Sequence, residues 1–318
     1  MCQIQTSDVV NRARLESFRT KHKEWCSSLN GDDLHSIWRQ QSSLLWDYAL
    51  FQTINELRKE AGQNSTKETG FNMPVLRLFD AGFAVTQAIG IRRLTDSQSK
   101  NNPLKRVISM KALVGDIREN RTLLVREVYL ACHEWPYDPA PAKQRFFDSV
   151  ASSGQEFSYV GMDTRGSEAW ADSESAHEHF DKLSEISPAA RSREDLVSLK
   201  WFDLLDSKIK ICEDVCVFAD KFIAHAADPT SRSEKNADQI KVTLNKLGEC
   251  HQALLQVAGF IGGSLLQDAL GGGLPTPQFN HLENLDKAWL GKADLNKARE
   301  YWNQQADQIE KWTATSLS

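Results

Sequence analysis

The chain has 318 residues, of which 41% are hydrophobic and 25% charged, a composition typical of a soluble globular protein. Its net charge of -5 and pI near 5.9 argue against strong attraction of the whole surface to nucleic acid or to an anionic membrane. Six scattered cysteines fit a reducing compartment, and no run of about eighteen uncharged apolar residues occurs. We therefore expect a cytoplasmic protein without a membrane-spanning segment.

Apolar residues recur with a period near 3.6 along almost the whole chain, which predicts an all-α protein. A first helix is expected to end at Asn30-Gly31, and a second to run from Asp32 or Asp33 to Glu60. The next segment, 74–96, is apolar on nearly all sides, so we expect a central, buried helix there.

The rest of the chain is also predicted to be mainly helical. Residues 153–190 are the exception, because they are rich in glycine, serine and acids with weak periodicity, which predicts an insertion or mobile arm. Helices are expected over about 104–119, 121–132, 192–225, 234–270 and 293–313. We interpret residues 1–318 as a single helical domain.

The helix expected to end at His225 carries an apolar stripe and a polar seam. The stripe consists of Leu205, Ile209, Cys212, Cys216, Ala219 and Ile223. The seam consists of Lys210, Asp214, Lys221, His225 and Asp228. A lysine and a histidine one turn apart beside a dry stripe are suited to acid–base chemistry or phosphate binding. The alternative, and the simpler interpretation of these residues alone, is a solvated helix end.

Charge is unevenly distributed along the chain. Residues 92–126 hold nine basic residues against three acids, whereas residues 155–230 hold sixteen acids against eight bases. One end of the molecule is therefore predicted to be locally positive. Alternatively, the basic helices pack beside the acidic ones and their fields largely cancel.

Histidine and cysteine pairs occur, but none predicts a metal site. His177 and His179 would point to different sides of a helix. Cys212 and Cys216 lie in the apolar stripe without an obvious second ligand pair, which favours core packing.

Two further histidines, His22 and His251, lie in apolar stripes and are expected to be hydrogen-bonded core residues. The glycines within 259–263 lie inside a helical pattern, which indicates a kink or a close helix approach and not phosphate binding. We therefore expect neither a metal nor another cofactor.

Two segments carry a resemblance to a known family. Residues 88–96 read Ala-Ile-Gly-Ile-Arg-Arg-Leu-Thr-Asp, and residues 219–228 read Ala-Asp-Lys-Phe-Ile-Ala-His-Ala-Ala-Asp. Together they resemble the abortive-infection, AbiU-like branch of the HEPN superfamily of helical domains. A Ser/Leu-rich helix of that branch is matched loosely by residues 107–114. The resemblance covers about residues 34–228, with 153–190 as an insertion and 229–318 as a C-terminal helical extension.

The resemblance implies a helical bundle, often a homodimer, in a superfamily rich in metal-independent ribonucleases of toxin and antiphage systems. Active members separate an arginine and a histidine on one helix by four to six residues. The corresponding positions before His225 are Phe218, Ala219 and Asp220, so the arginine is missing. Lys221 lacks the guanidinium fork and does not replace it equivalently.

Arg126 and His133 have the required spacing. The chain contains many arginines and histidines, however, so one Arg–His pair with this spacing is expected by chance. Arg92 or Arg93 is a candidate to supply the missing charge from another helix. Equally, Arg92 and Asp96 have the spacing of a structural i,i+4 pair.

We formulate two hypotheses of function. In the first, the protein cleaves or binds RNA in a defence or toxin system, with His225 as the acid–base or phosphate-contacting residue and Lys221, Arg92 and Arg93 as electrostatic stabilisers. Asp228 would then orient His225.

In the second hypothesis the chain is a catalytically inactive interaction module that binds a protein or small ligand near Asp96 and His225. The apolar stripes on the 205–223 and 240–265 helices further predict a homodimer, because one neighbour is not expected to cover each of them fully.

Overall fold

The computed structural model describes residues 8–63, 72–97, 106–153, 161–285, 287 and 294–314. The chain divides into two units, Met1–Pro275 and Thr276–Ser318, and the second contains helix α12 (Asp294–Ala314). The boundary follows the glycine- and proline-rich break at 271–275. Residues 229–275, expected as part of an extension, therefore belong to the first unit.

The first unit is helical, as predicted. Its α-helices are α1 (Arg12–Asn30), α2 (Ile37–Gln63), α3 (Met73–Leu94), α4 (Met110–Glu119), α5 (Arg126–Ala131), α6 (Ala140–Ser152), α7 (Trp170–Ser184), α8 (Leu199–Lys210), α9 (Glu213–Phe218), α10 (Pro229–Ser233) and α11 (Leu244–Gly259). Two π-helices, η5 (Ala219–Ala224) and η7 (Phe260–Leu266), continue α9 and α11. Short 3-10 turns lie at Arg121–Leu123, Gly166–Glu168, Pro188–Ala190 and Ala237–Gln239.

The described residues contain no strand, and an isolated bridge between Val125 and Leu196 is their one β-type pairing. The protein is therefore all-α. Within the same residues, we find no helix with the length and apolar character needed to cross a lipid bilayer.

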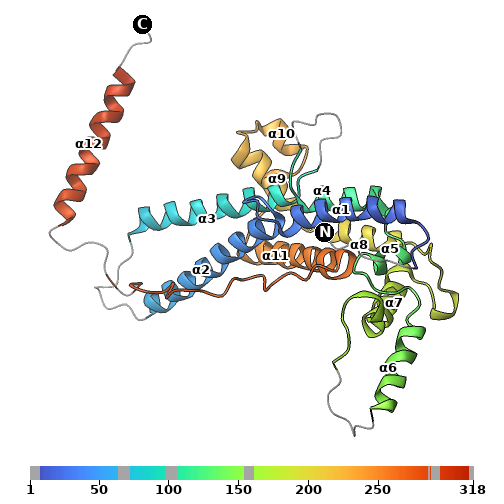
Figure 1. The fold of residues 1–318 in the computed structure, drawn as a ribbon. Coiled ribbons are helices and arrows are strands. Elements are labelled where there is room, and N and C mark those ends of the chain that lie inside the picture. The colour runs from blue at the N-terminus through green and yellow to red at the C-terminus, as the bar shows by residue number, and fades with distance from the viewer. Residues whose placement is uncertain are drawn as a thin grey trace. The chain divides into compact units, whose positions relative to one another are not determined.

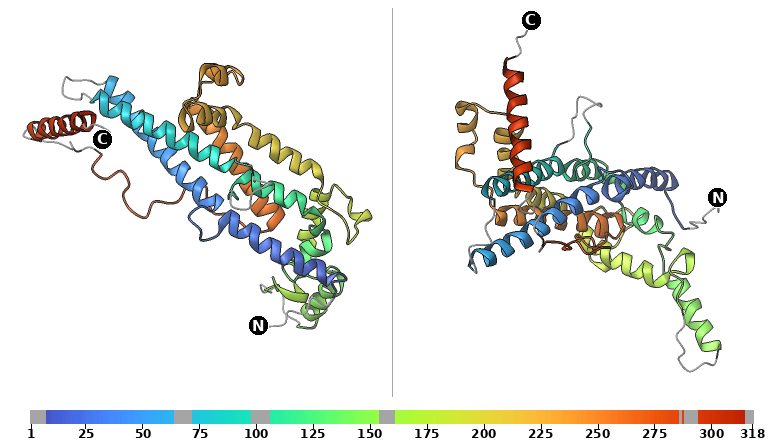
Figure 2. Two further views of the ribbon diagram at one scale, coloured as in Figure 1. Left: turned by 90° about the horizontal axis from the view of Figure 1, so that it is seen from above. Right: turned by 90° about the vertical axis from the view of Figure 1, so that its left-hand side faces the viewer.

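In the core of the first unit, α11 packs against α2, α3, α4 and α8, and α1 packs against α2, α4 and α5 (Figures 1 and 2). Its largest fully buried apolar side chains include Phe18, Trp25, Tyr129, Phe180 and Phe202. Helices α2 and α3 approach closely at Gly90, where a Cβ would lie 2.4 Å from Leu44. A larger residue at this position would force the Leu44 side chain to move.

Helix α3 is buried only in its second half, so the prediction of a helix buried throughout is wrong. Ala88, Ile91 and Leu94 are buried, whereas Leu78 is 75% exposed. The first half of α3 pairs with the second half of α2, and this hairpin projects away from the other helices of the unit (Figures 1 and 2). The sequence pattern shows that the helix is apolar, but not whether another helix covers it.

The mobile arm predicted at 153–190 is wrong for residues 170–184. They form α7, whose buried Ala176, Phe180 and Leu183 pack toward α5. Residues 154–160 lie outside the described residues. The periodicity was weak because polar Ser173 and His177 also face inward, with side-chain bonds to the Pro136 and Tyr137 carbonyls.

The continuous helix predicted over 192–225 is interrupted. Helix begins only at Leu199, because the carbonyls of Arg193 and Asp195 accept from the backbone N–H groups of Glu127 and Arg126 and the segment 192–195 forms a turn. Likewise, the helix expected from 234 begins at Leu244. Both apolar stripes are covered by the chain itself, with residues such as Leu205 and Leu254 buried, so the stated reason for a homodimer does not hold.

Candidate functional site

The two family-like segments meet in space at Arg92. Its Nε donates to the carboxylate of Asp220 on η5, and its Nη1 donates to Asp96 Oδ2 at 3.2 Å. The hydrogen bond to Asp220 is the largest cause that raises the pKa of Arg92. The arginine is therefore held by two carboxylates, each about 40% exposed.

Neighbouring polar atoms strengthen this junction between α3 and α9. Thr95 Oγ1 lies 3.0 Å from Cys216 Sγ, one turn before Asp220. Ser109, the N-cap of α4, donates its hydroxyl to the carbonyl of Asp96 at 2.6 Å. The junction thus joins the ends of three helices, which is the arrangement expected of a structural tie.

Lys221 and Asp228 are linked through Ser231. Lys221 Nζ donates to Ser231 Oγ at 2.7 Å, and the Ser231 N–H donates to Asp228 Oδ1 at 2.8 Å. Asp228 is thereby the N-cap of α10, whose first residue is Pro229. The structure gives Asp228 a capping role, and not the predicted role of orienting His225.

His225 follows the last residue of η5 and has an extended backbone, with φ -134° and ψ 136°. It therefore leaves the helical face that the sequence assigned to it together with Lys221. Its side chain is exposed, and among the described residues it makes no side-chain hydrogen bond or ion pair. Arg93, also exposed, donates to His35 Nδ1 at 3.1 Å in the segment before α2.

The predicted site residues therefore fall into separate groups. Arg92 and Asp96 meet, Lys221 and Asp228 share Ser231, and Arg93 contacts neither group. Asp220 is the central residue that sequence reasoning missed. It is one of the three positions at which the resemblance implies an arginine, and an acid there was the available indication that Arg92 would be neutralised.

The basic segment 92–126 is matched by acids across the helix interfaces. Arg118 on α4 bonds to Asp203 and Asp206 on α8 at 3.1 and 2.9 Å. Arg126 is fully buried against Asp181 and Asp195, at 2.8 Å from each, so it does not serve as a catalytic partner of His133. These contacts support the interpretation in which the opposing fields cancel.

His251 is a hydrogen-bonded core residue, as expected. Its Nε2 lies 2.7 Å from Gln87 Oε1, and its Nδ1 lies 3.4 Å from Gln41 Nε2. The neutral tautomer protonated on Nε2 satisfies both contacts, and burial lowers the pKa of His251 to about 4. Cys212 is also a buried core side chain.

No family model, curated protein or solved structure matches this chain.

Proposed function

We propose that the chain is a HEPN-like protein of the AbiU-like branch, acting in a cytoplasmic defence or toxin-type system as a helical interaction module and not as a ribonuclease. The family assignment rests on the resemblance of the segments 88–96 and 219–228, which contact each other through Arg92 and Asp220. The exposed apolar face of α3 carries the proposal of an interaction module.

This face, which we call the α3 surface, is formed by Val75, Leu78, Phe79, Gly82 and Val85, whose spacing places them along one side of the helix. The four large side chains are between 42% and 75% exposed. A Cβ added at Gly82 would meet nothing within 4 Å, so another helix could approach the backbone there closely. Contiguous exposed apolar residues of this kind mark protein interaction sites.

The α3 surface is held in place by contacts between α3 and α2. Phe51 of α2 stacks on Phe79 and Phe83 with ring centroids 5.6 and 3.7 Å away. Arg58 lies over the rings of Phe51 and Phe79 and bonds to Asp80 at 2.8 Å. The hairpin therefore presents a preformed surface, which lowers the entropic cost of association.

We propose a second copy of the chain as the occupant, because an apolar helix face can pack against the same face of another copy about a two-fold axis. The test is light scattering of the full chain. We expect twice the chain mass of 35.9 kDa for the wild type and a single chain mass for Leu78→Asp. Full burial of a leucine contributes about 1.5–3 kcal/mol, and each dimer interface would contain two copies of Leu78.

Leu204→Asp is the matched control, because Leu204 is 45% exposed in the middle of α8, away from the α3 surface. We expect this variant to remain dimeric. A wild type that has a single chain mass at every accessible concentration would reject the dimer. A Leu78→Asp variant that stays dimeric would reject the α3 surface as its interface.

RNA cleavage at His225 is the second candidate, and the exposure of this unpaired imidazole close to Lys221 in the chain favours it. Its test is incubation of labelled RNA with the full chain and with His225→Ala. Cleavage that the wild type performs and His225→Ala lacks, at equal melting temperature, would establish a ribonuclease and overturn the inactive module. We expect no cleavage by either protein.

A further inference from the structure

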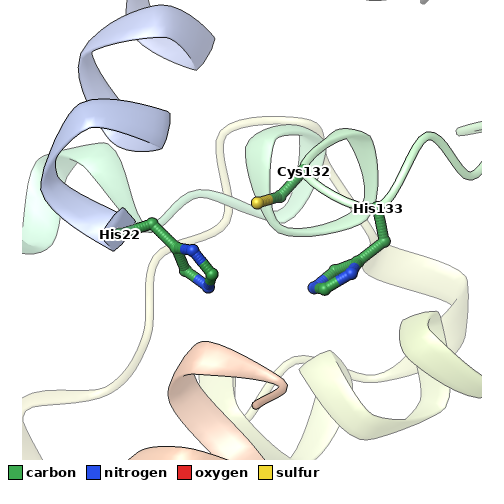
Figure 3. A group of neighbouring side chains, drawn as sticks. All are labelled: His22, Cys132 and His133. Carbon is green, nitrogen blue, oxygen red and sulfur yellow. The ribbon is translucent and has the colours of Figure 1, made fainter. Parts of the chain in front are cut away.

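Three potential metal ligands converge from two distant parts of the first unit, and a fourth, Cys26, lies beside one of them. His22 and Cys26 lie one turn apart on α1, and Cys132 and His133 lie in the turn after α5. One ligand atom each from His22, Cys132 and His133 lies within 4.8 Å of the other two. Figure 3 shows these three side chains facing a common space from two elements.

Cys26 is the candidate fourth donor, beside this group of three. Its Sγ lies 3.7 Å from each ring nitrogen of His22. In a tetrahedral zinc site, Zn–S and Zn–N bonds of about 2.3 and 2.0 Å place sulfur and nitrogen roughly 3.6 Å apart. The observed spacing of Cys26 Sγ and His22 Nδ1 therefore already fits one edge of such a site.

The hydrogen bond of His22 leaves its other nitrogen available. Nε2 lies 2.7 Å from the carbonyl oxygen of Leu266, at the end of η7, and must be the protonated nitrogen because a carbonyl only accepts. Nδ1 is then the unprotonated nitrogen, and its lone pair is available to an ion. A backbone carbonyl that fixes the tautomer in this way is the usual outer partner of a metal-bound histidine.

His133, which comes from the turn after α5, also has a ring nitrogen available to an ion. Its Nε2 is buried and has no hydrogen-bond partner. A buried polar atom of this kind costs about 1–3 kcal/mol unless something binds it. The ring is held in place by Trp135, which stacks on it with centroids 4.9 Å apart.

The backbone that presents Cys132 and His133 is itself unusual. Glu134, the next residue, has a φ of 69°, in the left-handed region that glycine normally occupies. Its N–H closes the turn on the carbonyl of Ala131 at 3.1 Å. Strain of this kind persists where a specific side-chain geometry is maintained.

We propose that His22, Cys26, Cys132 and His133 bind one zinc ion in a closed, tetrahedral site. Two cysteines and two histidines are a ligand set that selects zinc. With both cysteines as thiolates, their charge would balance that of the ion. Sequence reasoning passed over the site because its ligands form two pairs more than a hundred residues apart, and because His22 was interpreted as a core residue.

A thiol–imidazole catalytic pair is the competing interpretation of the same residues. That pair needs one thiol and one imidazole. An ion shared by ligands on α1 and in the turn after α5 would instead bind these two elements together, beside the end of η7.

The test is the zinc content of the full chain, measured by elemental mass spectrometry. The protein is first incubated with zinc, and unbound metal is removed by gel filtration. We expect one zinc per chain for the wild type and less than about one tenth for Cys132→Ser and His133→Gln. Affinity for Co²⁺ should fall by at least about 10- to 100-fold, the range seen even for the loss of outer partners. Wild-type Co²⁺ protein should show the visible absorption of a tetrahedral thiolate site.

Cys216→Ser is the control, because this thiol contacts Thr95 outside the cluster, and it should retain full zinc. Circular dichroism checks that each variant is folded. If a ligand variant does not fold, the wild type provides the test. Its melting temperature should be higher with zinc than with a chelator, because an ion that binds only the folded state stabilises that state. A wild type with no bound zinc, or a folded Cys132→Ser variant with as much zinc as Cys216→Ser, would overturn the proposal.

Discussion

Replacement of Arg92 by glutamine distinguishes a structural tie from a phosphate contact. In the structure its guanidinium donates to Asp220 and Asp96, and its side chain is 33% exposed. Glutamine keeps most of the aliphatic stem but removes the charge. If Arg92 joins the ends of α3 and η5, this change lowers stability and leaves affinity for RNA unchanged.

The expected loss follows from the exposure of the partners. Asp220 and Asp96 are 42% and 39% exposed, so each ion pair is screened and contributes roughly 0.2–1 kcal/mol. Both carboxylates remain hydrated after the arginine is removed, so no buried charge is left behind. We therefore expect Arg92→Gln to lower the free energy of unfolding by about 1 kcal/mol.

Urea unfolding followed by circular dichroism measures this loss. We expect the slope of the unfolding free energy against urea concentration to stay unchanged. Arg93→Gln is the matched control, because Arg93 is exposed and its side chain bonds to exposed His35, and we expect a change within about 0.5 kcal/mol. Fluorescence anisotropy of a labelled RNA at low salt supplies the second measurement. An Arg92→Gln variant with wild-type stability and more than tenfold weaker RNA binding would refute the structural role.

Two further predictions concern buried titratable groups. The folded-state pKa of His251 is lowered to about 4, so its contribution to stability is complete above about pH 6.5 and is lost as the pH falls toward 4. Relative to His251→Gln, the wild type should lose about 3 kcal/mol over this interval in urea titrations, and parallel curves would contradict the assignment. Arg126→Met should cost about 3–5 kcal/mol, measured in the same way, because Asp181 and Asp195 would lose a fully buried partner. A loss below 1 kcal/mol would show that these carboxylates become hydrated.

The helical class was predictable because the apolar period is set by local backbone geometry. The end of α1 at Asn30 agrees with the prediction, since the following Gly31 was a visible stop. Burial was harder to predict, because it depends on which neighbour covers a helix. The first half of α3 has the composition of a core helix, yet Leu78 is exposed.

The candidate site was predictable only in part. The pairing of Arg92 with Asp96 follows from their i,i+4 spacing, and the structure contains it. The position of His225 was not predictable from helical spacing, because η5 widens the last turn and the chain then becomes extended. The contact between Arg92 and Asp220 joins residues far apart in the sequence, and no local pattern encodes it.

Helix α3 connects the two features that bear on function. Its first half carries the exposed apolar face around Leu78, and its last turn holds Arg92 against Asp220. These residues are fourteen positions apart, or about 21 Å along a helix. A partner on the first half would therefore not cover Arg92 directly, so binding through the α3 surface does not require the polar junction to be an active site. The neutralised arginine and the accessible apolar face are thus consistent with one role, in which the junction fixes the base of α3 and its free half binds the partner.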